Sequence, residues 1–205
     1  MPGKAVAADA PEMTDLVFDL HASLVPENYP FQLWTEVLQH LPWAQDQQSM
    51  GILPLRGSIS SENILLSKRT KLILRVPVEF EAKTQALAGK KLNVGGQTLE
   101  VGQGKAREIQ PATTVHAYMV ESNLGEVDFI AEMKQKLQEM NIACNLICDK
   151  YRKISGATES LTGYGLVLHD LKPQSSLHIQ RSGLGGARHY GCGIFVPFKA
   201  ISGLE

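Results

Sequence analysis

Apolar and polar residues follow a regular pattern along the first half of the chain, and each change of period predicts a new element. Residues 13–20, MTDLVFDL, alternate as a strand with one buried face does. Residues 31–41 place apolar side chains near helical spacing, and Pro42 ends that helix. We then expect a hairpin of strands 63–66 and 71–76, a helix over 79–88, and a second hairpin over 91–101.

The second half repeats this order. Its pattern predicts a strand over 114–122, a helix over 126–140, a hairpin of 145–154 and 161–168, a helix over 173–180 and a strand over 193–198. Two successive βαββαβ units predict an α+β protein of two tandem ferredoxin-like (RRM-type) folds. We place the N-terminal fold at 13–110 and the C-terminal fold at 114–205, and we expect residues 1–12 to be a flexible leader.

The composition is that of an ordinary globular protein, with 43% hydrophobic and 20% charged residues. The formal net charge is −1, so a nucleic-acid surface would have to come from local segregation of charge. No run of about 18 uncharged apolar residues occurs, and we expect a cytoplasmic protein that does not engage a membrane. Cys144, Cys148 and Cys192 lack a second metal-type pair and are expected to be buried free thiols.

The segment 183–193, GLGGARHYGCG, holds five glycines in eleven positions with Arg188, His189 and Tyr190 among them. Glycine lets backbone amides approach a phosphate, and arginine adds a forked, charge-assisted contact. A dinucleotide site would need such a loop between a strand and a helix early in a βαβ unit, whereas this one enters the last strand. The loop therefore indicates a polyanion, with a purely structural hairpin loop as the alternative.

Positive charge gathers in the same half, where residues 150–199 contain seven lysines and arginines against two carboxylates. Lys68, Arg69, Lys71 and Arg75 form a second cluster without an acidic residue. Together with the glycine-rich loop, these clusters favour RNA as the polyanion. Few aromatic residues fall on the expected strands, so we expect recognition by loops and basic residues and not by base stacking on a sheet.

The six histidines form no HExxH motif or other close His/Cys grouping, so we expect neither a metal nor another cofactor. RNA cleavage would then rely on general acid and base catalysis at the 2′-hydroxyl, with histidine moving the proton and lysine or arginine stabilising the phosphorane.

Three segments together resemble one family: 183–199 (GLGGARHYGCGIFVPFK), 51–57 (GILPLRG) and 66–70 (LSKRT). The chain resembles the CRISPR-associated endoribonucleases of the sixth Cas family, in particular the Myxan-like subtype. The resemblance covers residues 13–198 and implies two ferredoxin-like folds and a glycine-rich loop near the C-terminus. It also implies recognition of a repeat stem-loop in precursor CRISPR RNA and metal-independent cleavage to a 2′,3′-cyclic phosphate.

The resemblance further implies a catalytic histidine near the first expected helix, where this chain has Tyr29 in the stretch 26–30 (PENYP). We therefore take Tyr29 and His40 as catalytic candidates, with His21 in reserve. The residues expected to contact RNA are Arg56, Ser67, Lys68, Arg69, Arg152, Lys153, Arg181, Arg188, His189 and Tyr190.

The expected partners are the CRISPR repeat RNA, through its stem-loop and 3′ handle, and other subunits of an effector complex. The missing histidine leaves a second hypothesis open: a non-cleaving RNA-binding subunit of a CRISPR effector or a CRISPR-associated transposon complex. A nucleotide-binding enzyme that uses the glycine-rich loop is the third and weakest reading.

Overall fold

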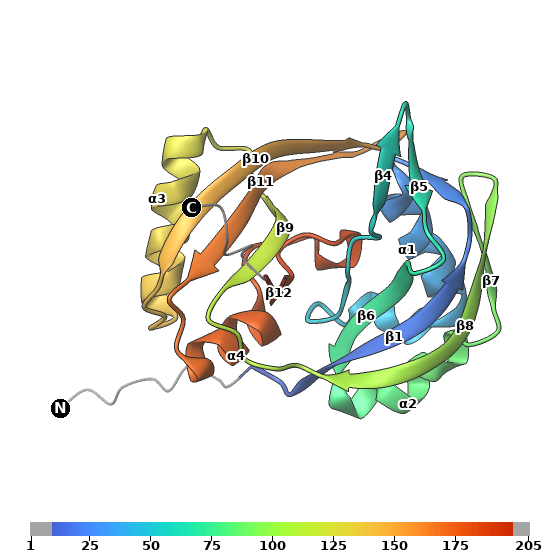
Figure 1. The fold of residues 1–205 in the computed structure, drawn as a ribbon, viewed down its shortest axis with the longest axis horizontal. Coiled ribbons are helices and arrows are strands. Elements are labelled where there is room, and N and C mark those ends of the chain that lie inside the picture. The colour runs from blue at the N-terminus through green and yellow to red at the C-terminus, as the bar shows by residue number, and fades with distance from the viewer. Residues whose placement is uncertain (1–9, 199–205) are drawn as a thin grey trace, which may run out of the picture.

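The computed structural model describes residues 10–198, which form two halves joined by a short link (Figure 1). The first half contains β1 (Met13–His21), β2 (Leu24–Pro26), α1 (Tyr29–His40), β3 (Gly51–Ile52), β4 (Gly57–Ser60), β5 (Asn63–Leu66), β6 (Lys71–Pro77), α2 (Glu81–Thr84), β7 (Lys91–Val94) and β8 (Gln97–Glu108). The second half contains β9 (Val115–Glu121), α3 (Glu126–Glu139), β10 (Asn145–Ser155), β11 (Ser160–His169), α4 (Pro173–Ser182) and β12 (Phe195–Pro197).

Each half is built on an antiparallel sheet with its first strand in the interior. The first sheet has the order β3-β6-β1-β8-β7 and the second the order β10-β11-β9-β12. In both, the first strand of the unit pairs with the third and the last strands of the βαββαβ series, which is the ferredoxin-like arrangement. The predicted fold class, two tandem ferredoxin-like folds, is confirmed.

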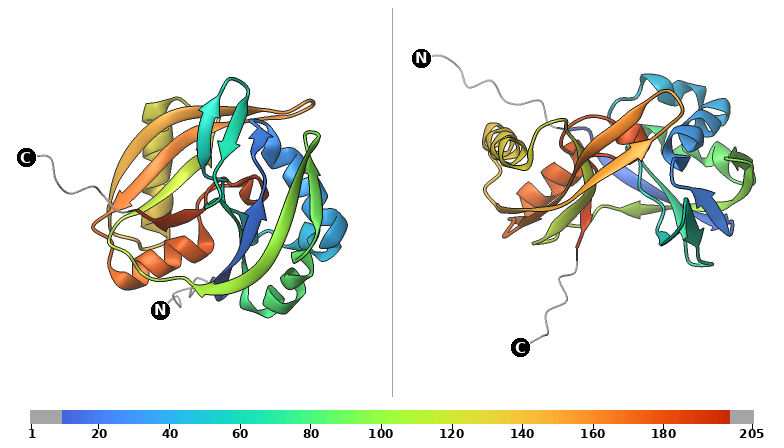
Figure 2. Two further views of the ribbon diagram at one scale, coloured as in Figure 1. Left: turned by 45° about the vertical axis from the view of Figure 1, so that its right-hand side comes forward. Right: turned by 90° about the horizontal axis from the view of Figure 1, so that it is seen from above.

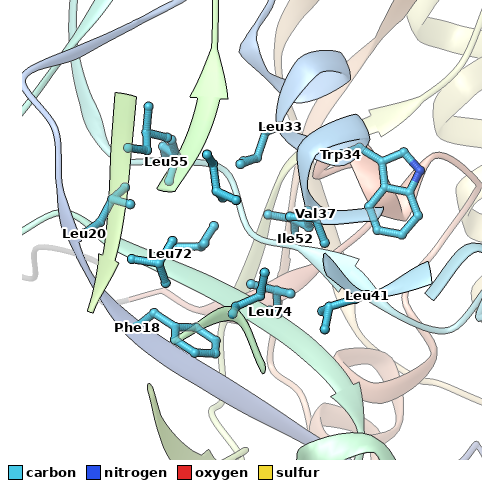
Figure 3. Packing of buried hydrophobic residues seen from close by; sticks show 14 of the residues in the cluster. Phe18, Leu20, Leu33, Trp34, Val37, Leu41, Ile52, Leu55, Leu72 and Leu74 are labelled. Atoms are coloured by element: carbon cyan, nitrogen blue, oxygen red, sulfur yellow. The ribbon is translucent and has the colours of Figure 1, made fainter. Parts of the chain in front are cut away.

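Each half has its own hydrophobic core. In the first, Leu33 and Val37 of α1 pack over Phe18, Leu72 and Leu74 of the sheet (Figure 3). In the second, α3 and α4 pack on one face of the sheet, at the end of the molecule away from α1 (Figures 1 and 2). The residues that α3 and α4 bury there include Phe129, Met133, Leu137 and Ile179.

The predicted hairpin of 63–66 and 71–76 is wrong. β5 pairs with β2 and β4 in a separate three-stranded sheet, whereas β6 pairs with β1 and β3. The turn at Ser67–Thr70 therefore links two sheets instead of closing one hairpin. The helix expected over 79–88 is also interrupted, because 3-10 turns flank the four residues of α2.

Of the predicted flexible leader, residues 1–9 lie outside the described residues. Next to them, the carbonyl of Glu12 accepts a hydrogen bond of 2.9 Å from the N–H of Val78.

All three cysteines are free thiols, with Cys192 buried and Cys144 and Cys148 half-buried. Burial raises the pKa of Cys192 to about 12.

Arg75 of β6 joins the two halves. Its side chain is 1% exposed, and its Nε donates to Oδ1 of Asp15 at 2.7 Å. Its Nη1 donates to two carbonyls of the second half, at 2.9 Å to Gln180 and 2.6 Å to Phe195. Arg107 makes a second contact with Asp15 at 3.0 Å. Arg75 thus belongs to the interior and not to the basic surface cluster that the sequence suggested.

Candidate nucleic-acid interface

The glycine-rich loop folds tightly upon itself between the two halves (Figure 1). Gly183 and Gly193 have φ angles of 68° and 66°, which favour glycine. A Cβ on Gly193 would lie 2.0 Å from the carbonyl oxygen of Leu184. Gly186 is exposed, but a Cβ there would lie 3.1 Å from a carboxylate oxygen of Glu121, which disfavours an anion beside it. Close packing of backbone explains these glycines better than a phosphate nest does.

Arg188 is buried inside the protein, which argues against its predicted contact with RNA. The residue is 6% exposed, and its guanidinium donates to the carbonyls of Ser49 at 3.1 Å and Ser182 at 2.9 Å. Burial lowers its pKa to about 10. Its donors are committed to backbone oxygens, so Arg188 holds the loop against the first half.

The two residues after Arg188 also pack on the first half. The ring of His189 stacks on Trp34 with centroids 4.2 Å apart, and its Nε2 lies 3.1 Å from the carbonyl oxygen of Gln47. The ring of Tyr190 packs against Phe31 at 4.9 Å. Both residues keep some exposed surface, and RNA contact by His189 and Tyr190 stays a prediction.

The structure separates the two leading catalytic candidates. Tyr29 is buried at the start of α1, where its hydroxyl accepts a hydrogen bond of 2.8 Å from the N–H of Leu55. Burial also raises the pKa of Tyr29 far above its ordinary value, which opposes proton transfer. His40 is the last residue of α1, and eleven steps along the helix place its backbone about 16 Å from that of Tyr29. The two side chains cannot act on one phosphate.

His21, by contrast, shares an open hollow of about 440 Å³ with Lys68. The end of β1, the turn after β5 and the start of β8 form its walls, and Ser23, Gln97, Thr98 and Glu100 also line it. Glu100 is paired with Lys91 at 3.0 Å. The hollow therefore offers an exposed imidazole and an exposed ammonium group to a ligand.

Three predicted RNA contacts surround the turn beside this hollow. Arg56, Lys68 and Arg69 are exposed, and within residues 10–198 none of them forms an ion pair. Ser67 and Thr70 shape the turn: the Ser67 N–H donates to Oγ1 of Thr70, whose hydroxyl donates to the Arg56 carbonyl at 2.9 Å. We call Arg56, Lys68 and Arg69 the basic turn. Lys71, from the same predicted cluster, is instead paired with Asp19.

The predicted cations of the second half do not form one patch. Arg152 is paired with Asp149 at 3.1 Å. Lys153 is exposed and, by strand alternation, points to the opposite side of β10. Arg181 is half-buried near the end of α4, and its Nε has no partner among the described residues. The segregation of charge along the sequence is thus not maintained in space.

Sequence reasoning predicted Arg152 as an RNA contact but missed the cluster that it joins on β9 and β10. Nε2 of His116 lies 3.8 Å from Oδ2 of Asp149, and the guanidinium carbon of Arg152 lies 4.4 Å from the ring centroid of Tyr118. Burial lowers the pKa of His116, although Asp149 acts in the other direction. The available signal was the alternation along β9, where Val115 and Ala117 are buried while the residues between and after them point away from that core.

The described residues contain no group of three histidine, cysteine, aspartate or glutamate side chains placed to hold a metal ion. Within the same residues, no helix has the length and apolar character needed to span a membrane.

Comparisons with known proteins agree along nearly the whole chain. The family model described as Cas6 Crispr matches residues 14–200. A CRISPR-associated endonuclease Cas6 of Myxococcus xanthus (strain DK1622) is 29% identical over 185 residues, or 89% of this chain and 80% of that protein. A solved structure named CRISPR associated protein Cas6 has a TM-score of 0.63 at 14% identity, covering 92% of this chain and all of that one.

A structure of Thermus thermophilus Cse3, bound to an RNA that represents a pre-cleavage complex, has a TM-score of 0.55 at 12% identity and covers 90% and 98% of the two chains. At these identities the two structural similarities concern the fold, and the family model provides the assignment. The chain therefore belongs to the Cas6 family of CRISPR proteins, as the motifs in its sequence indicated.

Proposed function

We propose that this protein is an endoribonuclease that processes precursor CRISPR RNA by cutting within the repeat. The observation that carries the proposal is the hollow shared by His21 and Lys68, because it combines a group that transfers protons with a cation that binds phosphate. Membership of the Cas6 family and the name of the Myxococcus relative, an endonuclease, support it.

The reaction is transphosphorylation without a metal. The ribose 2′-oxygen attacks the adjacent phosphorus, the bond from phosphorus to the 5′-oxygen breaks, and a 2′,3′-cyclic phosphate remains on the upstream fragment. The His21 imidazolium gives its proton to the departing 5′-oxygen while water takes the proton of the 2′-hydroxyl. The ammonium group of Lys68 stabilises the negative charge on the non-bridging oxygens.

The exposed basic turn suits a duplex. Lys68 and Arg69 project from the turn after β5, and Arg56 lies beside it, so these cations can reach phosphates on both sides of a groove without rearrangement of a sheet. We therefore propose that the protein binds the repeat stem-loop, stays on the 3′ handle after cleavage and joins other subunits of an effector complex. A non-cleaving RNA-binding subunit is the second candidate function, because Tyr29 is buried and, among the described residues, His21 is the one histidine that lines this hollow.

Labelled repeat RNA incubated with the purified protein in EDTA is expected to be cut at one position. A cyclic phosphate at the new end should resist alkaline phosphatase until acid opens it. As a control, repeat RNA with a 2′-deoxyribose at the cleaved position should bind equally well and stay intact. Native RNA that is bound but uncut would favour the non-cleaving subunit.

Replacing both Lys68 and Arg69 with alanine is expected to reduce the slope of log affinity against log salt by about 1.5, because two phosphate contacts are lost. The slope is measured by titrating a repeat stem-loop at several salt concentrations. Lys71→Ala is the matched control, since Asp19 already neutralises that lysine. An equal loss of slope in the control would show that general charge, and not the basic turn, carries the effect.

A further inference from the structure

The face of the second sheet away from α3 and α4 is only partly covered. Met119 of β9 and Leu161 of β11 are buried against Cys192 of the glycine-rich loop, and the rest of that face is open. Buried side chains of β9 and β11 such as Ala117 and Leu166 point to the core with α3 and α4. Because side chains alternate along a strand, His116 and Tyr118 of β9 point to the opposite side of the sheet. Asp149 of β10 and, beyond the bulge in that strand, Arg152 point to that side too. We call His116, Tyr118, Asp149, Arg152 and Phe198 the open face.

Exposed aromatic rings are concentrated on the open face. Tyr118 is 41% exposed and Phe198 is 45% exposed. His116 lies two residues before Tyr118 on β9, and its ring is 5.4 Å from the Phe198 ring. The guanidinium of Arg152 lies over the Tyr118 ring at 4.4 Å. Large aromatic surfaces are normally buried, so two exposed rings beside a stacked arginine indicate a binding surface.

Glycine keeps this surface compact. A Cβ on Gly165 of β11 would lie 2.6 Å from Nη1 of Arg152 and 2.8 Å from Oδ2 of Asp149. Both groups therefore rest directly on the backbone of the sheet. Any larger residue at position 165 would displace the arginine from its place over the Tyr118 ring.

The charge of the open face is nearly balanced, because Asp149 holds Arg152 at 3.1 Å. Burial lowers the pKa of His116 and favours the neutral imidazole. A phosphate would find little net attraction here. A flat, uncharged heterocycle with polar edges would find rings and a guanidinium plane to stack on, and hydrogen-bonding groups at its edge.

We propose that the open face binds an unpaired nucleobase of the RNA, with Tyr118 and Arg152 as the stacking pair. This proposal rests on the proposed function because it takes the ligand to be RNA. It adds a subsite for single-stranded RNA on the second half of the protein, beside the stem and phosphate contacts proposed for the first half. It also revises the expectation that no base stacks on a sheet.

Two RNA probes separate bases from phosphates: an octamer of uridine, and an octamer of abasic ribose units with the same number of charges. The wild-type protein is expected to bind the uridine octamer about tenfold more tightly than the abasic one. Tyr118→Leu should abolish this preference, and Tyr118→Phe should keep it. Tyr151→Leu is the control, because Tyr151 is 56% exposed but packs edge-on against Tyr164 on the opposite side of the sheet.

The proposal would be overturned if the Tyr118→Leu variant still preferred the uridine octamer. It would also be overturned if the wild-type protein bound both octamers equally, a result that would favour a protein partner on this face. Crosslinking of a 4-thiouridine octamer to the wild-type protein gives a second test that needs no variant. The crosslink should map to the peptide that contains Tyr118. Crosslinks confined to other peptides would contradict the inference. Cleavage of repeat RNA by the same preparation reports on the proposed function separately.

Discussion

His21→Ala is expected to lower the rate of repeat-RNA cleavage by roughly a hundred- to ten-thousandfold, because the departing 5′-oxygen loses its proton donor. Binding should change little, since the variant keeps Lys68 and the rest of the basic turn. Single-turnover cleavage with excess protein measures the chemical step apart from affinity. A stem-loop titration of the same variant checks the binding.

Three further variants locate the reaction. His169→Ala removes an imidazole from the far end of β11, where it pairs with Asp170, and should cleave at the full rate. His40→Ala and Tyr29→Phe test the positions expected from the family resemblance. If His40→Ala stops cleavage while His21→Ala does not, the reaction takes place at the other end of α1 and the hollow is not the active site.

Arg75→Met is expected to lower the free energy of unfolding by about 3–5 kcal/mol, because it leaves Asp15 buried with only one remaining cation. The carbonyls of Gln180 and Phe195 lose their donor at the same time. For a protein of this size the corresponding fall in melting temperature is roughly 10 °C. Chemical denaturation followed by circular dichroism gives the free energy directly.

Lys71→Met on the same strand provides the matched control. Its partner Asp19 is exposed, so solvent screens the pair and the free energy of unfolding should change little. A similar loss of unfolding free energy in the two variants would mean that Arg75 does not hold the two halves together. A loss confined to Arg75→Met would confirm that the buried arginine holds them together.

Local periodicity predicted most of the strands and helices of the two ferredoxin-like units, since those elements have one buried face. It missed β3, which pairs with β6 at the edge of the first sheet, and it expected a continuous helix over 79–88 where α2 has only four residues. It failed for 63–76, because two short strands beside a turn contain no signal for which neighbour they pair with. β5 pairs with β2, almost forty residues earlier in the chain. That choice depends on tertiary packing, which a window of neighbouring residues does not reveal.

The candidate site shows the same limit. A run of glycines beside an arginine suits an anion-binding nest and an internal clamp equally well, and only the contacts of Arg188 with Ser49 and Ser182 distinguish the two. His21 and Lys68 are distant in sequence and meet only because β1 and the turn after β5 end at one hollow. The residues of the basic turn are exposed, and their contact with RNA stays a prediction.

The contacts of Arg75 and Arg188 also determine when each half of the protein can finish folding during synthesis. Arg75 lies in the first half, but two of its partners are the carbonyls of Gln180 and Phe195, and Arg188 reaches back to Ser49. On the ribosome the first half therefore emerges with a buried cation that has only part of its partners. It becomes fully satisfied only after the segment that contains Gln180 and Phe195 has left the exit tunnel, so the first fold is completed together with the second.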